Sequence, residues 1–425
     1  MIDLRIIERK LDNGIPVLMV PMRGTGFFTH ICAVRAGSRY ESPKRNGISH
    51  LLEHMMFKGT KRRKTAHEIA VELSDMGASN NAFTNNEFIW FYVDALVEHF
   101  ARVADIMSDQ IINPIMRGSE LEKEKLVVFQ EMARSESDVG DVLGDMIMPM
   151  LYGDQPAGQN TIGTREAVAS TTTDKLRYWH RKYFNRNNLV IVVAGNLPPE
   201  NKALAILNEF YADVPQGERP QMPPLENKKV ERVSVAYKDI PQSSFVLAAK
   251  SFPFGSPEVP ALDLLTTILG KGMSSRLFRE VRENRGLAYT VSSSSQQATD
   301  TGFTYVSAGT DPSKVGETIM VIRREFANLL EHGISEGELA KAKNMLRSGF
   351  SRLSESRSSV ASSLAMEFLY SGTFSTPKEE MENRERVTAK EVVGLVPKVF
   401  FGPNLQLAVV GPHKGSMKDT LFSSL

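Results

Sequence analysis

Short apolar runs typical of buried strands alternate along this chain with longer segments that have the periodicity of amphipathic helices. The strand-like runs are Phe28–Ala36, Phe88–Val93, Leu189–Gly195, Phe245–Lys250 and Gly302–Gly309. Capping boxes, which mark the first turn of a helix, are formed by Thr65 with Glu68, Ser335 with Glu338 and Thr388 with Glu391. Because helices and strands alternate without strict βαβ units, the pattern predicts an α+β fold.

The chain divides near its midpoint at a polar, proline-rich stretch, VPQGERPQMPPL, which is typical of an extended linker. A chain of 425 residues is too long for one hydrophobic core. We therefore expect an N-terminal domain at 1–214, a linker at 215–228 and a C-terminal domain at 229–425.

The two halves also share sequence patterns. The segment NLVIVVAG at 188–195 has a counterpart, NLQLAVVG, at 404–411. Two apolar strands joined by a turn within 16–36 are matched by a similar pair within 234–252. These repeats indicate an internal duplication, so we expect two domains of similar fold.

Composition excludes several classes of function. A net charge of +1 and a hydrophobic content of 41% give no electrostatic footprint for nucleic acid or for a membrane surface. Cys32 is the only cysteine, which excludes an intrachain disulfide and suits a reducing compartment. Neither a membrane span nor a targeting segment is visible, so we expect a cytoplasmic protein. A mature organellar form without its presequence would have the same features.

The segment from His50 to His54, HLLEH, has the residue types and spacing of a zinc site. Histidines four residues apart lie on one face of a helix, so His50 and His54 can bind one ion together. Glu53 projects beside them and can take a proton from a metal-bound water. This is the inverted, or inverzincin, order of the HExxH motif.

A catalytic zinc ion usually has three protein ligands, so a third is expected elsewhere in the chain. A helix predicted to begin near Ser119 contains Glu124 and Glu131, which are two turns apart and share a face. One of these carboxylates could bind the metal while the other holds a ligand histidine in place.

The stretch HLLEHMMFKGT at 50–60 resembles the active-site signature of the M16, or pitrilysin-like, metallopeptidases. In that family a glutamate follows the second histidine by 77 residues, and the residue at this distance is Glu131. The resemblance implies that His50, His54 and Glu131 are zinc ligands. It also implies that Glu53 is the general base and that Glu124 orients a ligand histidine.

The resemblance covers nearly the whole chain and implies two α/β-sandwich domains that face each other as a clamshell. At the position in the second half that corresponds to HLLEH, the sequence is DLLTT at 263–267, which has no metal ligand. We therefore expect the C-terminal domain to bind substrate rather than metal.

Two further segments resemble substrate-binding parts of the family. The stretch containing Asn81, Ala82, Phe83 and Thr84 is similar to an edge strand that binds peptide by strand addition, although an ordinary turn into a strand would have the same composition. Arg282 and Tyr289 match an arginine and a tyrosine that contact the substrate carbonyl. Arg285 is an alternative to Arg282, and a solvated helix end followed by a packed tyrosine would also fit.

The predicted function is a zinc-dependent endopeptidase that hydrolyses unfolded peptides or oligopeptides inside a clamshell chamber. The short, two-domain length implies a homodimer by resemblance. Two alternatives remain open: a dedicated peptidase that processes presequences or precursors, and a non-catalytic structural subunit of a peptidase complex.

Overall fold

The computed structural model describes residues 3–402 and 404–413, which form two compact units. The first unit contains the chain up to Ala133 together with Gln159–Pro224 and Ser351–Lys378. The second contains Arg134–Gly158, Leu225–Phe350 and the chain from Glu379 onwards. No helix of the described residues is both long enough and apolar enough to cross a membrane.

The first unit is built on a six-stranded sheet with the order β1-β2-β6-β3-β5-β4. Its strands are β1 (Ile7–Lys10), β2 (Pro16–Pro21), β3 (Phe27–Arg35), β4 (Ser79–Thr84), β5 (Phe88–Leu96) and β6 (Leu189–Gly195). β6 runs parallel to β2 and antiparallel to β3, while β4 pairs only with β5 and is therefore an edge strand of this sheet.

The second unit has a five-stranded sheet with the order β7-β11-β8-β10-β9. Its strands are β7 (Val233–Tyr237), β8 (Ser243–Ser251), β9 (Ala288–Gln297), β10 (Gly302–Thr310) and β11 (Gln406–Gly411). β11 runs parallel to β7 and antiparallel to β8, as β6 does with β2 and β3. The sequence repeats thus fall on topologically equivalent strands, and the α+β fold with an internal duplication is confirmed.

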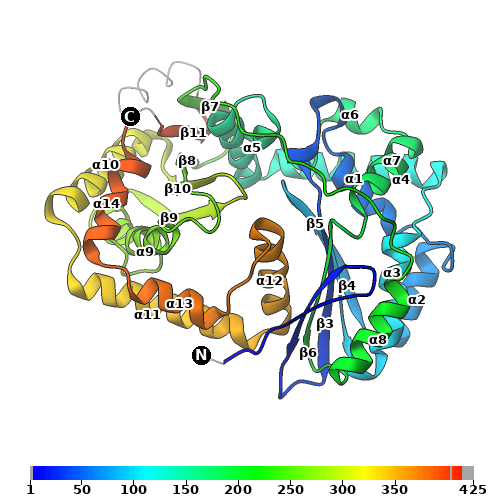
Figure 1. Ribbon diagram of the computed structural model, residues 1–425. Coiled ribbons are helices and arrows are strands. Elements are labelled where there is room, and N and C mark those ends of the chain that lie inside the picture. The colour runs from blue at the N-terminus through cyan, green and yellow to red at the C-terminus, as the bar shows by residue number, and fades with distance from the viewer. Residues whose placement is uncertain (1–2, 403, 414–425) are drawn as a thin grey trace. The chain divides into compact units, whose positions relative to one another are not determined.

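Helices cover both faces of each sheet (Figure 1). The longer ones are α1 (Ile48–Met56), α2 (Ala66–Asp75), α3 (Phe100–Ile112), α4 (Gly118–Ser137), α5 (Val139–Tyr152), α7 (Thr173–Tyr183), α8 (Glu200–Tyr211), α9 (Val259–Gly270), α10 (Val315–His332), α11 (Glu336–Glu355), α12 (Arg357–Ser371), α13 (Pro377–Glu385) and α14 (Ala389–Phe400). α6 (Arg165–Ala169) and a π-helix at Phe278–Glu283 are shorter. The capping boxes predicted at Ser335 and Thr388 are present. At Thr65 the hydroxyl accepts a hydrogen bond from the N–H of Glu68, but the Glu68 carboxylate accepts from the N–H of Lys64 and not of Thr65, so this box is incomplete. α4 begins at Gly118, so Ser119 lies inside its first turn.

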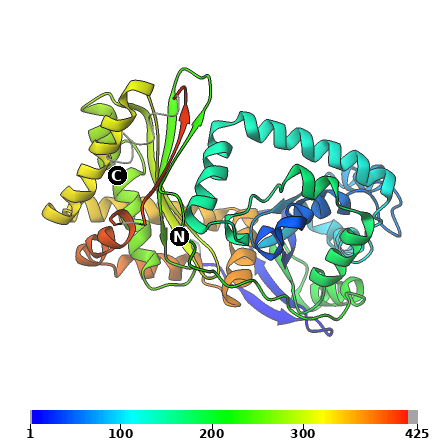
Figure 2. The same ribbon diagram turned by 90° about the horizontal axis from the view of Figure 1, so that it is seen from above.

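Each half of the chain contributes one helix to the sheet of the other half. α5 lies against β8 and β11 of the second unit (Figure 2). Its apolar side chains Leu143 and Ile147 join a cluster with Ala248 and Val410. α12 packs on β3 and β6 of the first unit. The compact units therefore differ from the sequence halves at 1–214 and 229–425, although the border at Pro224 falls inside the proline-rich stretch. Between α8 and β7, residues 214–231 have no regular structure.

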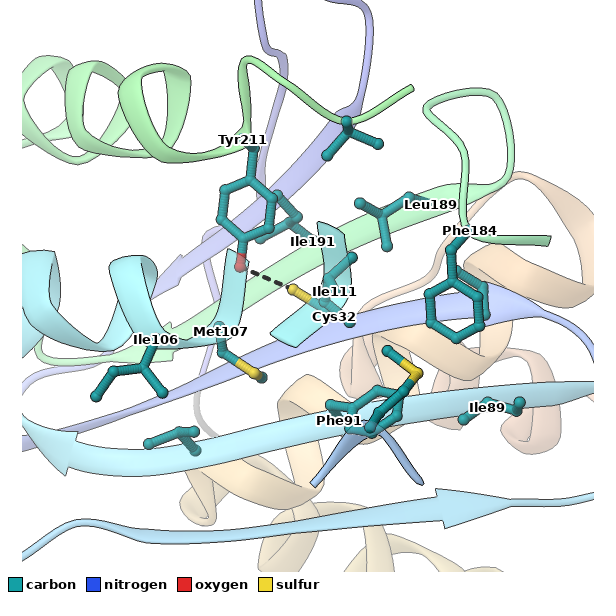
Figure 3. Packing of buried hydrophobic residues seen from close by; sticks show 14 of the residues in the cluster. Cys32, Ile89, Phe91, Ile106, Met107, Ile111, Phe184, Leu189, Ile191 and Tyr211 are labelled. Carbon is teal, nitrogen blue, oxygen red and sulfur yellow. Dashed lines mark hydrogen bonds between the residues drawn. The ribbon is translucent and has the colours of Figure 1, made fainter. Parts of the chain in front are cut away.

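A short chain of polar groups crosses the core of the first unit. The Tyr211 hydroxyl lies 2.9 Å from the Cys32 sulfur (Figure 3). It also lies 3.1 Å from Nε2 of His30, and all three side chains are completely buried. Burial lowers the pKa of His30 to about 3 and raises the pKa of the Cys32 thiol to about 12. The imidazole is therefore neutral and the thiol protonated at neutral pH, so Cys32 is a packed core residue without thiolate reactivity.

We expect His30 to make the protein sensitive to acid. The unfolded chain takes up a proton at this residue below about pH 6.5, whereas the folded chain does so only near pH 3. The contribution of His30 to the free energy of unfolding is therefore fully present above pH 6.5. It falls as the pH decreases below that value, by up to about 1.4 kcal/mol per pH unit. Urea unfolding at several pH values measures this slope. His30→Gln should flatten it, while His67→Gln, at an exposed position of α2, should leave it unchanged; equal slopes in both variants would contradict the assignment.

Candidate metal centre

Helix α1, which contains HLLEH, is amphipathic in the manner needed to present its polar side chains. Ile48, Leu51, Leu52, Met55 and Met56 are buried in the main core of the first unit. This apolar stripe leaves His50, Glu53 and His54 partly buried on the remaining face.

The N-terminus of α1 is held by a buried carboxylate. Glu41 is 1% exposed, and its carboxylate accepts hydrogen bonds from the backbone N–H groups of Gly47 at 2.7 Å and Ser49 at 2.8 Å. The side-chain amide of Asn46 donates a third bond. Burial raises the pKa of Glu41, and these donors oppose that shift. The first turn of α1 thereby gains the capping that its own N-cap residue, Gly47, lacks.

Gly47 is required at this point for two reasons. Its φ of 92° lies in the left-handed region, and a Cβ there would lie 2.5 Å from the carbonyl oxygen of Ile162. The loop before α6 therefore packs directly on the backbone that begins the helix. Together with Glu41, this contact fixes the position of the helix from which His50 and His54 project.

The two histidines meet a carboxylate from α4. Glu131 Oε2 lies 3.8 Å from Nε2 of His50 and 3.6 Å from Nε2 of His54. One ligand atom from each of the three residues lies within 4.8 Å of the others. This is the one cluster of potential metal ligands found in the described part of the chain.

Glu124 lies on the same face of α4 as Glu131, two turns earlier, and determines which nitrogen of His54 is protonated. Its Oε2 lies 3.2 Å from Nδ1 of His54, and its Oε1 lies 2.7 Å from the ammonium group of Lys58. An ionised carboxylate only accepts hydrogen bonds, so Nδ1 must donate and Nε2 of the neutral ring keeps its lone pair. That lone pair faces the carboxylate of Glu131, and two acceptors at this distance favour a cation between them.

The donor set fits zinc. Two imidazoles and one carboxylate are a common protein ligand set for a catalytic zinc ion. Bonds of about 2.0–2.2 Å in tetrahedral geometry would separate ligand atoms by about 3.4 Å, slightly less than the 3.8 and 3.6 Å from Glu131 Oε2 to Nε2 of His50 and of His54. Burial, followed by the neighbouring His54, lowers the pKa of His50 to about 4, so the His50 ring is neutral and able to bind metal at neutral pH.

Glu53 lies beside this cluster and contacts the edge strand of the sheet. Its Oε2 accepts a hydrogen bond from the hydroxyl of Thr84, the last residue of β4. Burial raises the pKa of the Glu53 carboxyl, while the bond from Thr84 and the neighbouring His54 act in the opposite direction. A carboxylate with a raised pKa next to a metal site is suited to general-base chemistry.

Comparison with known proteins matches most of the chain to one family. Residues 27–165 match the model of Insulinase (Peptidase family M16), and residues 170–346 match the model of the Peptidase M16 inactive domain. A Rickettsia felis protein named as an uncharacterized zinc protease is 31% identical over 405 residues, which are 95% of this chain and 97% of that protein. The chain belongs to peptidase family M16.

Other relatives agree with this assignment. A Bacillus subtilis protein, also named as an uncharacterized zinc protease, is 32% identical over 381 residues, covering 89% of this M16 chain and 91% of the relative. Among solved structures, a protease from Helicobacter pylori superposes with a TM-score of 0.89 at 22% identity, covering 96% of this chain and 100% of the other. The structural likeness shows the short, two-domain M16 fold.

The residues expected to bind substrate lie in different parts of this M16 fold. Asn81, Ala82, Phe83 and Thr84 lie on the edge strand β4, where the Phe83 ring stacks on Trp90 with the centroids 4.9 Å apart. Arg282 and Tyr289 lie in the second unit, in the π-helix and on β9. The Arg282 guanidinium lies over the ring of Phe278, and Tyr289 is 58% exposed. Their role at the metal centre, and the choice between Arg282 and Arg285, stay predictions.

Two residues of the site, Glu41 and Lys58, and the contact of the Thr84 side chain with Glu53 were not found from the sequence. Glu41 lies nine residues before His50 and has no motif spacing that marks it as a cap. Lys58 and the side chain of Thr84 interact with Glu124 and Glu53 only because the fold brings α1, α4 and β4 together. In the second unit, Asp263 of the DLLTT segment forms a partly buried ion pair with Arg384 at 2.6 Å, a structural role.

Proposed function

We propose that this M16 chain is a zinc-dependent endopeptidase that hydrolyses unfolded peptides or oligopeptides. The observation that supports it is the convergence of acceptor atoms from His50, His54 and Glu131, with Glu53 beside them on α1. The relatives named as zinc proteases support the same metal and the same class of reaction.

Each residue of the site has a separate task in this reaction. His50, His54 and Glu131 would hold the ion, and Glu124 keeps His54 in the tautomer that binds metal. A zinc ion held there supplies Lewis-acid chemistry, lowering the pKa of water toward about 7 and polarising a carbonyl oxygen. Glu53 accepts the proton of the attacking water and returns it to the leaving amine.

The substrate is proposed to be an extended peptide because β4 is an edge strand. Such an edge has backbone N–H and C=O groups that can pair with an added strand, and this pairing depends little on side-chain identity. A clamshell chamber, a homodimer, and contacts from Arg282 and Tyr289 to the substrate carbonyl are further parts of this proposal, which rest on the resemblance to the family.

Metal analysis together with peptide cleavage tests the proposal. The purified protein should contain about one zinc ion per chain and cleave a mixture of quenched fluorescent peptides. A chelator should remove both zinc and activity, and added zinc should restore both. Failure to bind zinc after resupply, or zinc binding without cleavage of any peptide, would contradict an endopeptidase function.

A further inference from the structure

We propose that the side chain of Thr84 is a positioning residue that fixes the carboxylate of Glu53 for proton transfer. The inference rests on the proposed function and adds to it a residue on the peptide-binding strand. Its basis is the hydrogen bond from Thr84 Oγ1 to Glu53 Oε2, which joins the end of β4 to the middle of α1.

The side chains of β4 point alternately to two sides of the sheet, which have different surroundings. Along Ser79–Thr84 the side chains alternate between exposed and half-buried, and Asn80, Ala82 and Thr84 are the half-buried set. Ala82 packs against the core beneath the sheet, and Thr84 points toward the same side, where α1 lies. The side chain of Thr84 is therefore available to Glu53 while the outer backbone edge of β4 is available to a peptide.

The backbone that carries the Thr84 side chain is fixed by the strand pairing and by the turn that follows it. Thr84 pairs with Ile89 in the β4–β5 ladder, and the next residue, Asn85, accepts hydrogen bonds from the N–H groups of Glu87 and Phe88 at 2.8 Å. This Asx turn closes the hairpin immediately after Thr84. A threonine side chain is also stiff about χ1 because it is branched at Cβ. The donor is thus preorganised before Glu53 accepts its hydrogen bond.

Glu53 has little else to fix its orientation. Within residues 3–402 and 404–413, the hydroxyl of Thr84 is the one hydrogen-bond donor found for this carboxylate. Glu53 is a flexible side chain on a helix face, whereas proton transfer requires its oxygens to lie within hydrogen-bond reach of the reacting groups. The bond to Oε2 restrains the side-chain torsions and leaves Oε1 as the oxygen that can accept a proton.

This arrangement joins substrate binding to the general base. The strand that would align the peptide backbone also restrains, through its last side chain, the group that takes the proton. Removing the hydroxyl should therefore lower kcat and leave KM nearly unchanged, because β4 keeps its backbone. A displacement of about 1 Å at a reacting group can cost about 100-fold in rate, so a loss of about 10- to 100-fold is expected.

Two substitutions separate this role from simple packing. Thr84→Val keeps the shape and the β-branch but removes the hydroxyl, whereas Thr84→Ser keeps the hydroxyl. We expect Thr84→Val to lower kcat about 10- to 100-fold with KM, zinc content and melting temperature close to wild type. Thr84→Ser should retain most of kcat. Thr173→Val, at the start of α7, makes the same chemical change at a threonine whose hydroxyl accepts a hydrogen bond from Arg177 and does not contact Glu53, and it should have no effect.

The proposal is overturned if Thr84→Val keeps the wild-type kcat, or if it raises KM at an unchanged kcat, which would indicate a substrate contact. It is also overturned if Thr84→Ser loses as much activity as Thr84→Val. Should Thr84→Val fail to fold, Thr84→Ala provides the same comparison with Thr84→Ser. A crystal structure of the valine variant supplies a readout without activity: the Glu53 carboxylate should leave its wild-type position. If the wild type cleaves no peptide, the proposed function fails, while the crystal structure still tests the contact.

Discussion

Glu53→Gln is expected to abolish most peptide hydrolysis while zinc content stays near that of the wild type. Glutamine has nearly the same size and can still accept the hydrogen bond from Thr84, so the helix and the ligand residues should not move. An amide cannot take up the proton of the attacking water at neutral pH. General acid–base catalysis contributes about 100- to 10,000-fold, and a loss of kcat in that range is expected.

The measurement compares kcat, KM and bound zinc for the wild type and Glu53→Gln in the same preparation. Glu98→Gln, an exposed carboxylate in the short helix before α3, is the matched control and should behave as wild type. Loss of zinc in Glu53→Gln would mean that this residue holds the metal site together rather than serving as its base. Retention of full activity would transfer the general-base role to another residue.

The strands and the clustering of the candidate metal-binding residues could be predicted because each has a local or family-specific signal. β6 has the predicted bounds Leu189–Gly195, and the other predicted strands differ from the observed ones by a few residues at their ends. A short, continuous apolar run rich in β-branched residues is typical of a strand that is buried on both faces, as β6 is. His50 and His54 are four residues apart, so helix geometry alone brings them together. Glu131 was found through family spacing, since nothing local to α4 distinguishes it from Glu124.

The features that could not be predicted depend on tertiary packing. The apolar sides of α5 and α12 indicate burial, but neither pattern says which of two similar sheets will receive the helix. A duplicated fold makes this ambiguity acute, because the faces of the two sheets have similar residues. The cap formed by Glu41 also has no recognisable sequence motif. Its carboxylate reaches the N-terminus of α1 only because a 3-10 turn at Pro43–Arg45 brings the chain back toward Glu41.

Glu131→Ala is expected to lose both zinc and peptide hydrolysis. Removing this carboxylate leaves two imidazoles as the protein ligands of the ion, one fewer than a catalytic zinc site normally has. It also removes the negative charge that lies 3.6–3.8 Å from the two Nε2 atoms. Zinc content after dialysis and competition with a chelator of known affinity measure the effect. Added zinc should restore little activity to this variant.

Comparison with two other glutamates on α4 shows whether the effect belongs to the ligand position. Glu124→Gln removes the charge that orients His54 but no ligand, so zinc affinity should fall by about 10- to 100-fold, less than in Glu131→Ala. Glu122→Ala changes an exposed carboxylate paired with Lys125 and should retain zinc and activity. If Glu124→Gln lost more zinc than Glu131→Ala, the two carboxylates would have the opposite roles. Their ranking therefore tests the assignment of the third ligand directly, since both side chains lie on one face of the same helix.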